Sequence, residues 1–413
     1  MTDIQQETPQ RNVLKIAIVS DIHAYDHLND DKEAPSFLCT VAPENRVSHH
    51  PIAGLLKLID DQSIRADILM CCGDMGDKAR PAGILYTWDK LHVIKRKLEA
   101  KTLAVTAGNH DVDSRYKYTD YDAKGLLQSL VPPFPCEDEK LNDKFWARNY
   151  IVFSEPDYRL VILNTSAYHG AKEGEFEHGR ITPRTVEALK AELEVLEHEQ
   201  PRRVNILLCH HHPHNHGDIE DKDVSLMEGG AKLLELLGSG DYGNWIVIHG
   251  HKHHPRISYA AASISPPIVF SAGSLCARIY EELQGQARNQ FYVITFPLSD
   301  LDTLELGLIG TFQAWDWLPG IGWQRATLRS GLPASGGFGN RGDITSISKT
   351  IATIFASKKQ PWVEWNEIIG AFPQVSYLLP ISLQAIIKKL ESNYNLTVSR
   401  DSDGQPLQIG RSL

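Results

Sequence analysis

The sequence lacks the features that mark several large classes of protein. Lysine and arginine number 42 against 52 aspartate and glutamate residues, which gives a formal net charge of −10. This balance excludes a protein whose whole surface grips nucleic acid, because such affinity comes mainly from basic side chains that neutralise phosphates. No window approaches eighteen consecutive apolar residues, which excludes a membrane-spanning helix. The polar start, MTDIQQETPQRN, does not resemble a secretory signal, so we expect a cytoplasmic protein without membrane attachment.

Cysteine is also scarce. The chain has six cysteines in 413 residues and no C-x-x-C pair, and several of the cysteines end apolar runs. We therefore expect reduced packing residues rather than disulfides or thiolate metal ligands. What the chain does contain is 42% hydrophobic and 23% charged residues, the composition of an ordinary folded protein.

Short apolar runs alternate with helical patterns through the first three quarters of the chain. The runs are continuously apolar, which suits strands buried on both faces, and they span residues 13–21, 66–74, 102–111, 159–166, 204–212, 244–251 and 267–274. Later strand-like runs occupy 290–296 and 304–312. Helical patterns occupy 51–64, 87–101, 182–199 and 230–237. The alternation predicts a layered α/β domain.

Metal-binding side chains gather at or just beyond the carboxyl ends of these runs. That rim is where ligands bind in layered α/β folds, because loops converge there over a rigid sheet. Carboxylates, imidazoles and one amide, without thiolates, favour manganese, iron, zinc or a similar first-row ion. One loop holds five histidines among residues 210–216, which leaves open which of them is a ligand.

The same residues form five ordered blocks. They are D-x-H (Asp21, His23), G-D (Gly73, Asp74), G-N-H-D (Gly108 to Asp111), a histidine before x-Pro (His211 to Pro213) and G-H-x-H (Gly250 to His253). This ordered set, within residues 13 to about 296, resembles the calcineurin-like metallophosphoesterase superfamily. The resemblance implies a layered β-sandwich flanked by helices and a metal-dependent phosphoric ester hydrolase.

The resemblance also implies two divalent metal ions. One would be held by Asp21, His23, Asp74 and His253, and the second by Asp74, Asn109, His211 and His251. Asp74 would bridge them, and a hydroxide shared by the ions would be the nucleophile. We expect manganese first, with iron, zinc or nickel as alternatives.

Roles for neighbouring residues follow from the same resemblance. His110 is assigned to the leaving group, as general acid or as a donor to developing charge, with Asp111 orienting its ring. Asp77 matches a carboxylate position common in the family, outside the ligands themselves. The His-x-Pro spacing selects His211 as the ligand, with His212 as the alternative register, and it leaves His210 buried or facing the backbone.

The substrate is less constrained than the reaction. Residues 178–196, HGRITPRTVEALKAELEVL, resemble the subgroup that includes bacterial cyclic-nucleotide phosphodiesterases, so a small nucleotide-like phosphodiester is favoured over a phosphomonoester. The insertion 112–146 carries Arg115 and Tyr116, which we expect, with His212, to contact phosphate or base. A surface excursion with structural aromatic residues is an equally good interpretation of this insertion.

The C-terminal part reads as a separate unit. We expect a flexible tail over 1–12, a catalytic domain over 13–327, a glycine-rich linker over 328–343 and a small winged-helix-like α+β domain over 344–413. Its helical patterns cover 344–357, 363–371 and 381–393, and a hairpin is predicted within 396–410. Residues 341–413 contain eight basic and six acidic side chains, a net of +2. The third helix offers only Lys388 and Lys389, and the hairpin offers only Arg400, so the signal for nucleic-acid binding is weak. A protein partner or homodimer is favoured for this domain, and the alternative is a nuclease whose substrate the domain recruits.

Overall fold

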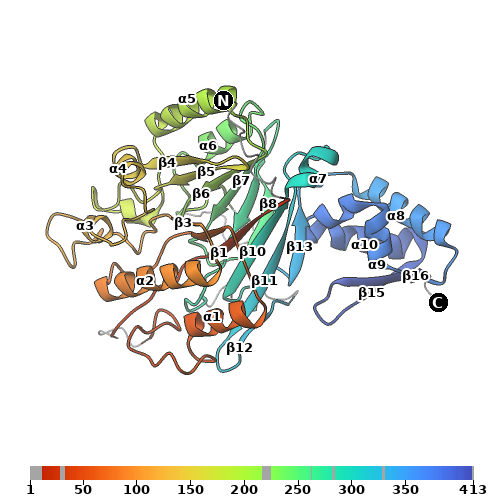
Figure 1. Cartoon of the computed structure of the whole chain (residues 1–413), viewed down its shortest axis with the longest axis horizontal. Helices are drawn as coiled ribbons and strands as arrows, with labels where there is room; N and C mark the ends of the chain where they lie inside the picture. Colours follow the sequence, from red (N-terminus) through yellow and green to blue (C-terminus); the bar gives the residue numbers. More distant parts are fainter. Residues whose placement is uncertain are drawn as a thin grey trace, which may run out of the picture.

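The computed structural model describes residues 12–27, 33–215, 225–261, 263–280, 283, 285–327 and 331–411. Two β-sheets lie face to face in the larger domain, helices cover their outer sides, and a smaller domain follows at the C-terminal end (Figure 1). The predicted layered sandwich flanked by helices is confirmed. Within the described ranges, every helix is too short or too polar to cross a membrane.

The first sheet contains seven strands, and two helices, α1 (Pro51–Asp61) and α2 (Pro81–Lys97), occur between its strands in the chain. The strands are β1 (Val13–Val19), β2 (Ile68–Cys71), β3 (Thr102–Val105), β10 (Gln290–Pro297), β11 (Gly310–Leu318), β12 (Gly322–Arg325) and β13 (Ser335–Phe338). The strand order is β12-β11-β10-β1-β2-β3, and β13 also pairs with β11. β1, β2 and β3 are parallel, so their carboxyl ends share one edge of the sheet.

The second sheet contains six strands. In spatial order they are β4 (Tyr150–Ser154), β5 (Tyr158–Leu163), β6 (Val204–Leu208), β7 (Trp245–His249), β9 (Ile268–Ser271) and β8 (Arg256–Tyr259). β5, β6, β7 and β9 are parallel, whereas the edge strands β4 and β8 are antiparallel to their neighbours. The other helices of this domain are α3 (Gly125–Gln128), α4 (Glu139–Arg148), η1 (Glu175–Glu177), α5 (Pro183–Glu199), α6 (Gly230–Leu237) and α7 (Leu298–Thr303).

The continuously apolar runs are explained by cores on both faces of the sheets. Along β6, Ile206 and Leu208 belong to the large core between the sheets, whereas Leu207 belongs to a second core with Leu189 of α5 and Leu233 of α6. Successive strand residues point to opposite faces, so a strand between two cores must be apolar at every position. All six cysteines are free thiols, as predicted.

Several boundaries differ from the sequence-based expectation, and two of the differences have a clear local cause. α2 begins at Pro81, six residues before the expected start at residue 87, because proline is suited to the first helical turn. The expected strand over 304–312 does not form until Gly310, where β11 begins. Glu305 and Gly307 have positive φ angles of 51° and 72°, which interrupt an extended chain before that point.

The C-terminal domain has the predicted three helices and hairpin. Its elements are α8 (Ile344–Lys358), β14 (Trp362–Glu364), α9 (Trp365–Ala371), η3 (Pro373–Tyr377), α10 (Pro380–Tyr394), β15 (Leu396–Arg400) and β16 (Pro406–Arg411). Asp343 caps α8 by accepting a hydrogen bond from the Ser346 amide. Ile351, Ile368 and Ile409 belong to a core that is separate from the two cores of the larger domain.

The glycine-rich segment differs from the predicted linker over 328–343. Its residues 335–338 form β13 and pair with β11 of the larger domain. A side chain on Gly337 would overlap with the Ser376 carbonyl, so this glycine allows the C-terminal domain to pack closely against the strand. Tyr377 donates a hydrogen bond of 2.6 Å to Asp300, which also ties the domains together. Residues 328–330 of the segment, and residues 1–11 of the expected tail, lie outside the described residues.

Candidate metal centre

The candidate ligands meet at the carboxyl ends of strands from both sheets. β1, β2 and β3 deliver residues from the first sheet, and β6 and β7 deliver residues from the second. Four groups of three side chains each bring potential ligand atoms within 4.8 Å of one another: His210, His211 and His251; Asp21, His23 and His253; His23, Asp74 and His110; and Asp21, Asp74 and His210. These groups share members, so they form one continuous cluster.

One side of the cluster is formed by Asp21, His23 and His253. His23 Nε2 lies 3.2 Å from His253 Nε2, and His253 Nε2 lies 3.4 Å from Asp21 Oδ1. All three residues are at most 4% exposed. Two imidazole nitrogens that face each other repel unless a proton or a cation lies between them, so this donor set fits a metal ion.

The other side is formed by Asn109, His210 and His251. His210 Nε2 and His251 Nδ1 each lie 3.1 Å from Asn109 Oδ1 and 3.3 Å from each other. Asp74 stands between the two sides, because its Oδ2 atom is 3.3 Å from His210 Nε2 and 3.5 Å from His23 Nε2. One carboxylate oxygen is therefore within reach of both sets of donors.

The structure places His210, rather than His211, against Asp74 and Asn109. His210 Nδ1 lies 2.7 Å from the Cys72 carbonyl, which can only accept, so Nδ1 carries a proton and Nε2 is directed at the centre. His211 Nδ1 instead lies 2.8 Å from the Thr165 hydroxyl. β6 ends at Leu208, earlier than the expected run 204–212, so His210 and His211 both lie beyond the strand. Neighbouring side chains point to different sides of the chain, and a choice that is wrong by one residue therefore selects the wrong side chain.

The two neighbouring histidines also differ electrostatically. Burial would lower the pKa of His210, but the adjacent Asp74 carboxylate outweighs burial and raises this pKa to about 9. Burial, together with the nearby imidazoles of His251 and His210, lowers the pKa of His211. A cation at the centre would replace the proton that Asp74 stabilises on His210. His212, expected to contact substrate, is fully buried and stacks on the His251 ring.

Backbone strain is concentrated at the same cluster. Five of its residues are non-glycine residues with positive φ: Asp21 (49°), His23 (49°), Asp74 (53°), His251 (75°) and His253 (53°). Such conformations cost free energy and persist where the surrounding structure enforces them, commonly at functional sites. A side chain on Gly108 would overlap with Asp74, and one on Gly250 would overlap with Asp21, so the glycines of two sequence blocks allow this close approach.

Comparison with known families decides the classification. The family model for calcineurin-like phosphoesterases matches residues 14–255, more than half of the chain. The chain belongs to the calcineurin-like phosphoesterase family. A model for a calcineurin-associated wHTH domain matches residues 336–392, which confirms the predicted winged-helix-like unit.

Solved structures similar to this phosphoesterase are distant in sequence. A 5'-nucleotidase precursor from Thermus thermophilus is 11% identical over 69% of this chain and 51% of its own, with a TM-score of 0.35. PhoD is 11% identical over 80% of this chain and 70% of its own, with a TM-score of 0.44. The NAD nucleotidase NadN from Haemophilus influenzae is 12% identical over 69% of this chain and 47% of its own, with a TM-score of 0.32. This chain spans about half the length of the 5'-nucleotidase, and no curated protein sequence matches it.

His110 of the phosphoesterase has a different carboxylate partner from the one expected. Asp77 Oδ1 lies 3.4 Å from His110 Nδ1. Asp111 instead accepts hydrogen bonds from the backbone amides of Asp74, Gly108 and Met75 at 2.7 to 2.9 Å. Asp111 therefore holds two ligand loops together, and the carboxylate beside the His110 ring belongs to Asp77.

Charge around His110 favours its protonated form. Burial alone would lower the pKa of His110, but the Asp74 and Asp77 carboxylates outweigh burial and raise it. The ring also makes an edge contact with His23, with centroids 4.5 Å apart, so it borders the candidate ligands. The His110 ring therefore lies beside the cluster in surroundings that favour its protonated form.

Arg115 and Tyr116 make contacts within the phosphoesterase itself. The Arg115 guanidinium lies 4.0 Å above the Phe176 ring, and the Tyr116 hydroxyl donates to the Gly170 carbonyl. Both side chains therefore fasten the insertion 112–146 to the loop before α5. These contacts support the interpretation of the insertion as a structural excursion.

Tyr280 borders the cluster and was missed by the sequence analysis. Its ring stacks on that of His253, with planes 12° apart and centroids separated by 5.2 Å. It lies in a loop between β9 and β10, and no motif or periodicity marks it.

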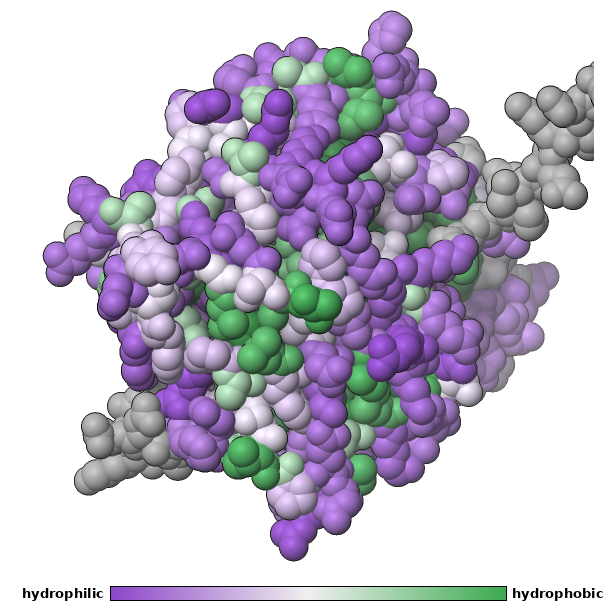
Figure 2. Space-filling view, turned by 60° about the vertical axis from the view of Figure 1, so that its left-hand side comes forward, coloured by the Kyte–Doolittle hydropathy of each residue, from purple (hydrophilic) through white to green (hydrophobic). Residues whose placement is uncertain are grey.

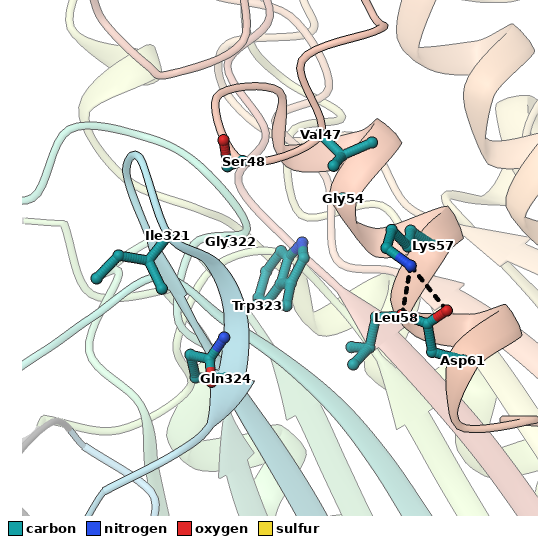
Figure 3. Close-up of a pocket in the computed structure, with 10 residues that line it drawn as sticks. All are labelled: Val47, Ser48, Gly54, Lys57, Leu58, Asp61, Ile321, Gly322, Trp323 and Gln324. Carbon is teal, nitrogen blue, oxygen red and sulfur yellow. Dashed lines mark hydrogen bonds and ion pairs between the residues drawn. The ribbon is translucent and has the colours of Figure 1, made fainter.

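A separate cleft lies between α1 and the hairpin of β11 and β12 (Figure 3). Gly54, Lys57 and Asp61 line it from the helix, and Gly322 and Trp323 line it from the hairpin. None of the candidate ligands contributes to this cleft, so the metal centre remains the best candidate for the reaction.

Proposed function

We propose that the protein hydrolyses a phosphodiester in a small, nucleotide-like substrate with two divalent metal ions. Asp21, His23, Asp74 and His253 would hold one ion, and Asp74, Asn109, His210 and His251 would hold the other. The observation that carries the proposal is the position of Asp74 Oδ2, which is 3.5 Å from His23 Nε2 and 3.3 Å from His210 Nε2. A shared carboxylate lowers the mutual repulsion of two cations. We propose manganese first, with iron, zinc or nickel as alternatives.

When bound, the two ions would polarise the phosphoryl oxygens and lower the pKa of water at the site. The polypeptide supplies orientation. The Cys72 carbonyl fixes the ring of His210, and the backbone amide of His251 donates to Asp21 Oδ1 at 3.0 Å. These bonds hold ligand atoms in place before a substrate arrives, which reduces the reorganisation that the reaction requires.

His110 is the residue we assign to the leaving group. Water adds to phosphorus, the phosphorus–oxygen ester bond breaks, and the departing oxygen takes a proton from the His110 ring. Asp77 faces Nδ1 of this ring, so Nε2 is left for the substrate. The neighbouring carboxylates raise the pKa of His110 despite its burial, which supports the protonated form that a general acid requires.

The contacts of the C-terminal domain favour a role other than nucleic-acid binding. Asp403 at the hairpin turn lies 3.5 Å from Arg325 of β12, and Arg400 donates to Gln384 and to the Gly404 carbonyl. Arg400 of the hairpin and Arg325 of the larger domain are thus both engaged within the protein. Ile381 of α10 is 73% exposed, and we propose that this domain contacts a protein partner or a second copy of the chain. The face shown in Figure 2, which brings the left-hand side of Figure 1 forward, is mainly hydrophilic and has only separate small hydrophobic patches.

The decisive experiment combines metal analysis with a substrate panel. The protein is stripped of metal, reloaded with manganese, and assayed on bis(p-nitrophenyl) phosphate, p-nitrophenyl phosphate, cyclic nucleotides, and single- and double-stranded DNA. We expect two ions per chain and preferential hydrolysis of small diesters. One ion per chain would contradict the paired centre. Salt-sensitive cleavage of DNA that disappears when residues 341–413 are deleted would favour the nuclease alternative.

A further inference from the structure

Tyr280 is an exposed aromatic residue fixed against a candidate metal ligand. Its ring is nearly parallel to that of His253, with an interplanar angle of 12° and a centroid separation of 5.2 Å. His253 itself is 2% exposed and directs Nε2 at Asp21 and His23, whereas Tyr280 is 53% exposed. His253 therefore lies on the buried side of the pair, and the flat aromatic ring of Tyr280 lies on the side that faces solvent.

The loop that carries Tyr280 is anchored before and after this residue. The Phe37 amide donates to the Cys276 carbonyl at 2.7 Å, and the Arg278 amide donates to the Pro35 carbonyl at 2.8 Å. After Tyr280, the amide of the buried Leu283 donates back to the Tyr280 carbonyl at 3.0 Å. With its backbone held in this way and its ring already stacked on His253, Tyr280 loses little conformational freedom when a second ring stacks on it.

We propose that Tyr280 is the stacking platform for the base of a nucleotide substrate whose phosphate lies at the metal centre. This assignment rests on the proposed function and names its substrate class. Base stacking on an aromatic side chain tolerates all four bases, because every base has a π face. Tyr280 would thus select nucleotides over aliphatic phosphoesters without selecting among the bases.

The groove between the two domains is the competing place for the base. Arg256, Gln286 and Leu332 line it from the larger domain, and Ile381 and Gln384 line it from α10, around a volume of about 500 Å³. His254, which directly follows His253 in the chain, also lines this groove. Tyr280 is favoured over the groove because its ring directly contacts a candidate ligand.

The test compares AMP with ribose 5-phosphate, which share the sugar and the phosphate and differ by the base. Calorimetry of the manganese-loaded full chain gives both dissociation constants without relying on turnover. We expect AMP to bind about tenfold more tightly than ribose 5-phosphate to the parent protein. Tyr280→Ala should abolish this ratio, and Tyr280→Phe should preserve it.

Two control variants separate the possible outcomes. Tyr121→Ala removes another tyrosine, 89% exposed, and should leave the ratio unchanged. Ile381→Ala alters the interdomain groove, so loss of the ratio in this variant alone would overturn the assignment to Tyr280. Equal binding of the two compounds by the parent, or a ratio that survives Tyr280→Ala, would also overturn it while leaving the phosphoesterase proposal intact. Failure of the parent to bind either compound, together with no hydrolysis of nitrophenyl esters, would refute both.

Discussion

The two histidine-bearing loops of the second sheet present their side chains in different ways. After β7, His251 and His253 lie two residues apart, and both face the cluster from backbones with positive φ. After β6, three consecutive histidines are fully buried and turn in different directions. His210 faces Asp74, His211 faces the Thr165 hydroxyl, and His212 stacks on His251.

The difference shows what determines a ligand. In the G-H-x-H block, the spacing of the histidines and the preceding glycine already restrict which side chains reach the centre. In the histidine run, residue type is the same at three positions, so the partner that each ring meets decides which one faces the centre. The carbonyl of Cys72 accepts a hydrogen bond from Nδ1 of His210, and this contact directs Nε2 to Asp74 and Asn109.

The largest expected loss of activity comes from substitution of Asp74, which lies between the two sets of proposed ligands. Asp74→Asn keeps the size of the side chain but removes the charge that the two sets of donors share. We expect turnover of bis(p-nitrophenyl) phosphate to fall by several orders of magnitude and bound metal to fall below two ions per chain, with little change in thermal stability. Asp61→Asn, on the exposed end of α1, is the matched control. Activity within about tenfold of the parent would disprove the bridging role.

The histidine run supplies a direct comparison between neighbours. His210→Ala should lower kcat by more than about a hundredfold and reduce the metal content, because it removes a proposed ligand. His211→Ala removes an equally buried side chain that faces Thr165, so we expect it to reduce stability while changing kcat per folded molecule by less than about tenfold. Kinetics and metal analysis at equal folded fractions would distinguish them. The reverse order would restore His211 as the ligand.

Much of this centre was accessible from the sequence because its residues follow strands. Apolar runs ending at Asp21 and Asp74, and the G-H-x-H block after β7, predicted one shared rim, and the family match supports the class of reaction. The direction of a side chain after the strand ends was not accessible. No periodicity distinguishes His210 from His211, and no pattern reveals that the carboxylate of Asp111 is used by backbone amides.

The glycine-rich segment shows the same limit at the domain level. Its composition is that of a linker, yet residues 335–338 form a strand because β11 offers a partner along its length. Gly337 then serves close packing against Ser376 rather than chain flexibility. Composition predicts what a segment does alone, whereas its neighbours determine what it does in the fold.

Substitution of His110, at the edge of the candidate metal centre, should lower activity by a smaller factor that depends on the leaving group of the substrate. His110→Ala should slow hydrolysis of diesters with poor leaving groups by about a hundredfold and affect activated nitrophenyl esters much less, because nitrophenolate departs without a proton. Asp77→Asn should show the same pattern more weakly, since it acts by orienting the His110 ring. Asp111→Asn is the contrast: we expect a loss of stability with no dependence on the leaving group. An equal loss on both ester types in His110→Ala would exclude the acid role.

The smallest effects should come from two glycines, one beside each loop. A side chain on Gly250 would overlap with Asp21, so Gly250→Ala should weaken metal binding. A side chain on Gly179 would overlap with His211, so Gly179→Ala should lower the free energy of unfolding by about 1 to 3 kcal/mol while two ions per chain still bind. Metal titration and thermal melting of both variants would measure these losses separately. If Gly179→Ala instead removed one ion, the ring displaced by the new methyl group would have to be a ligand, and the centre would include His211 after all.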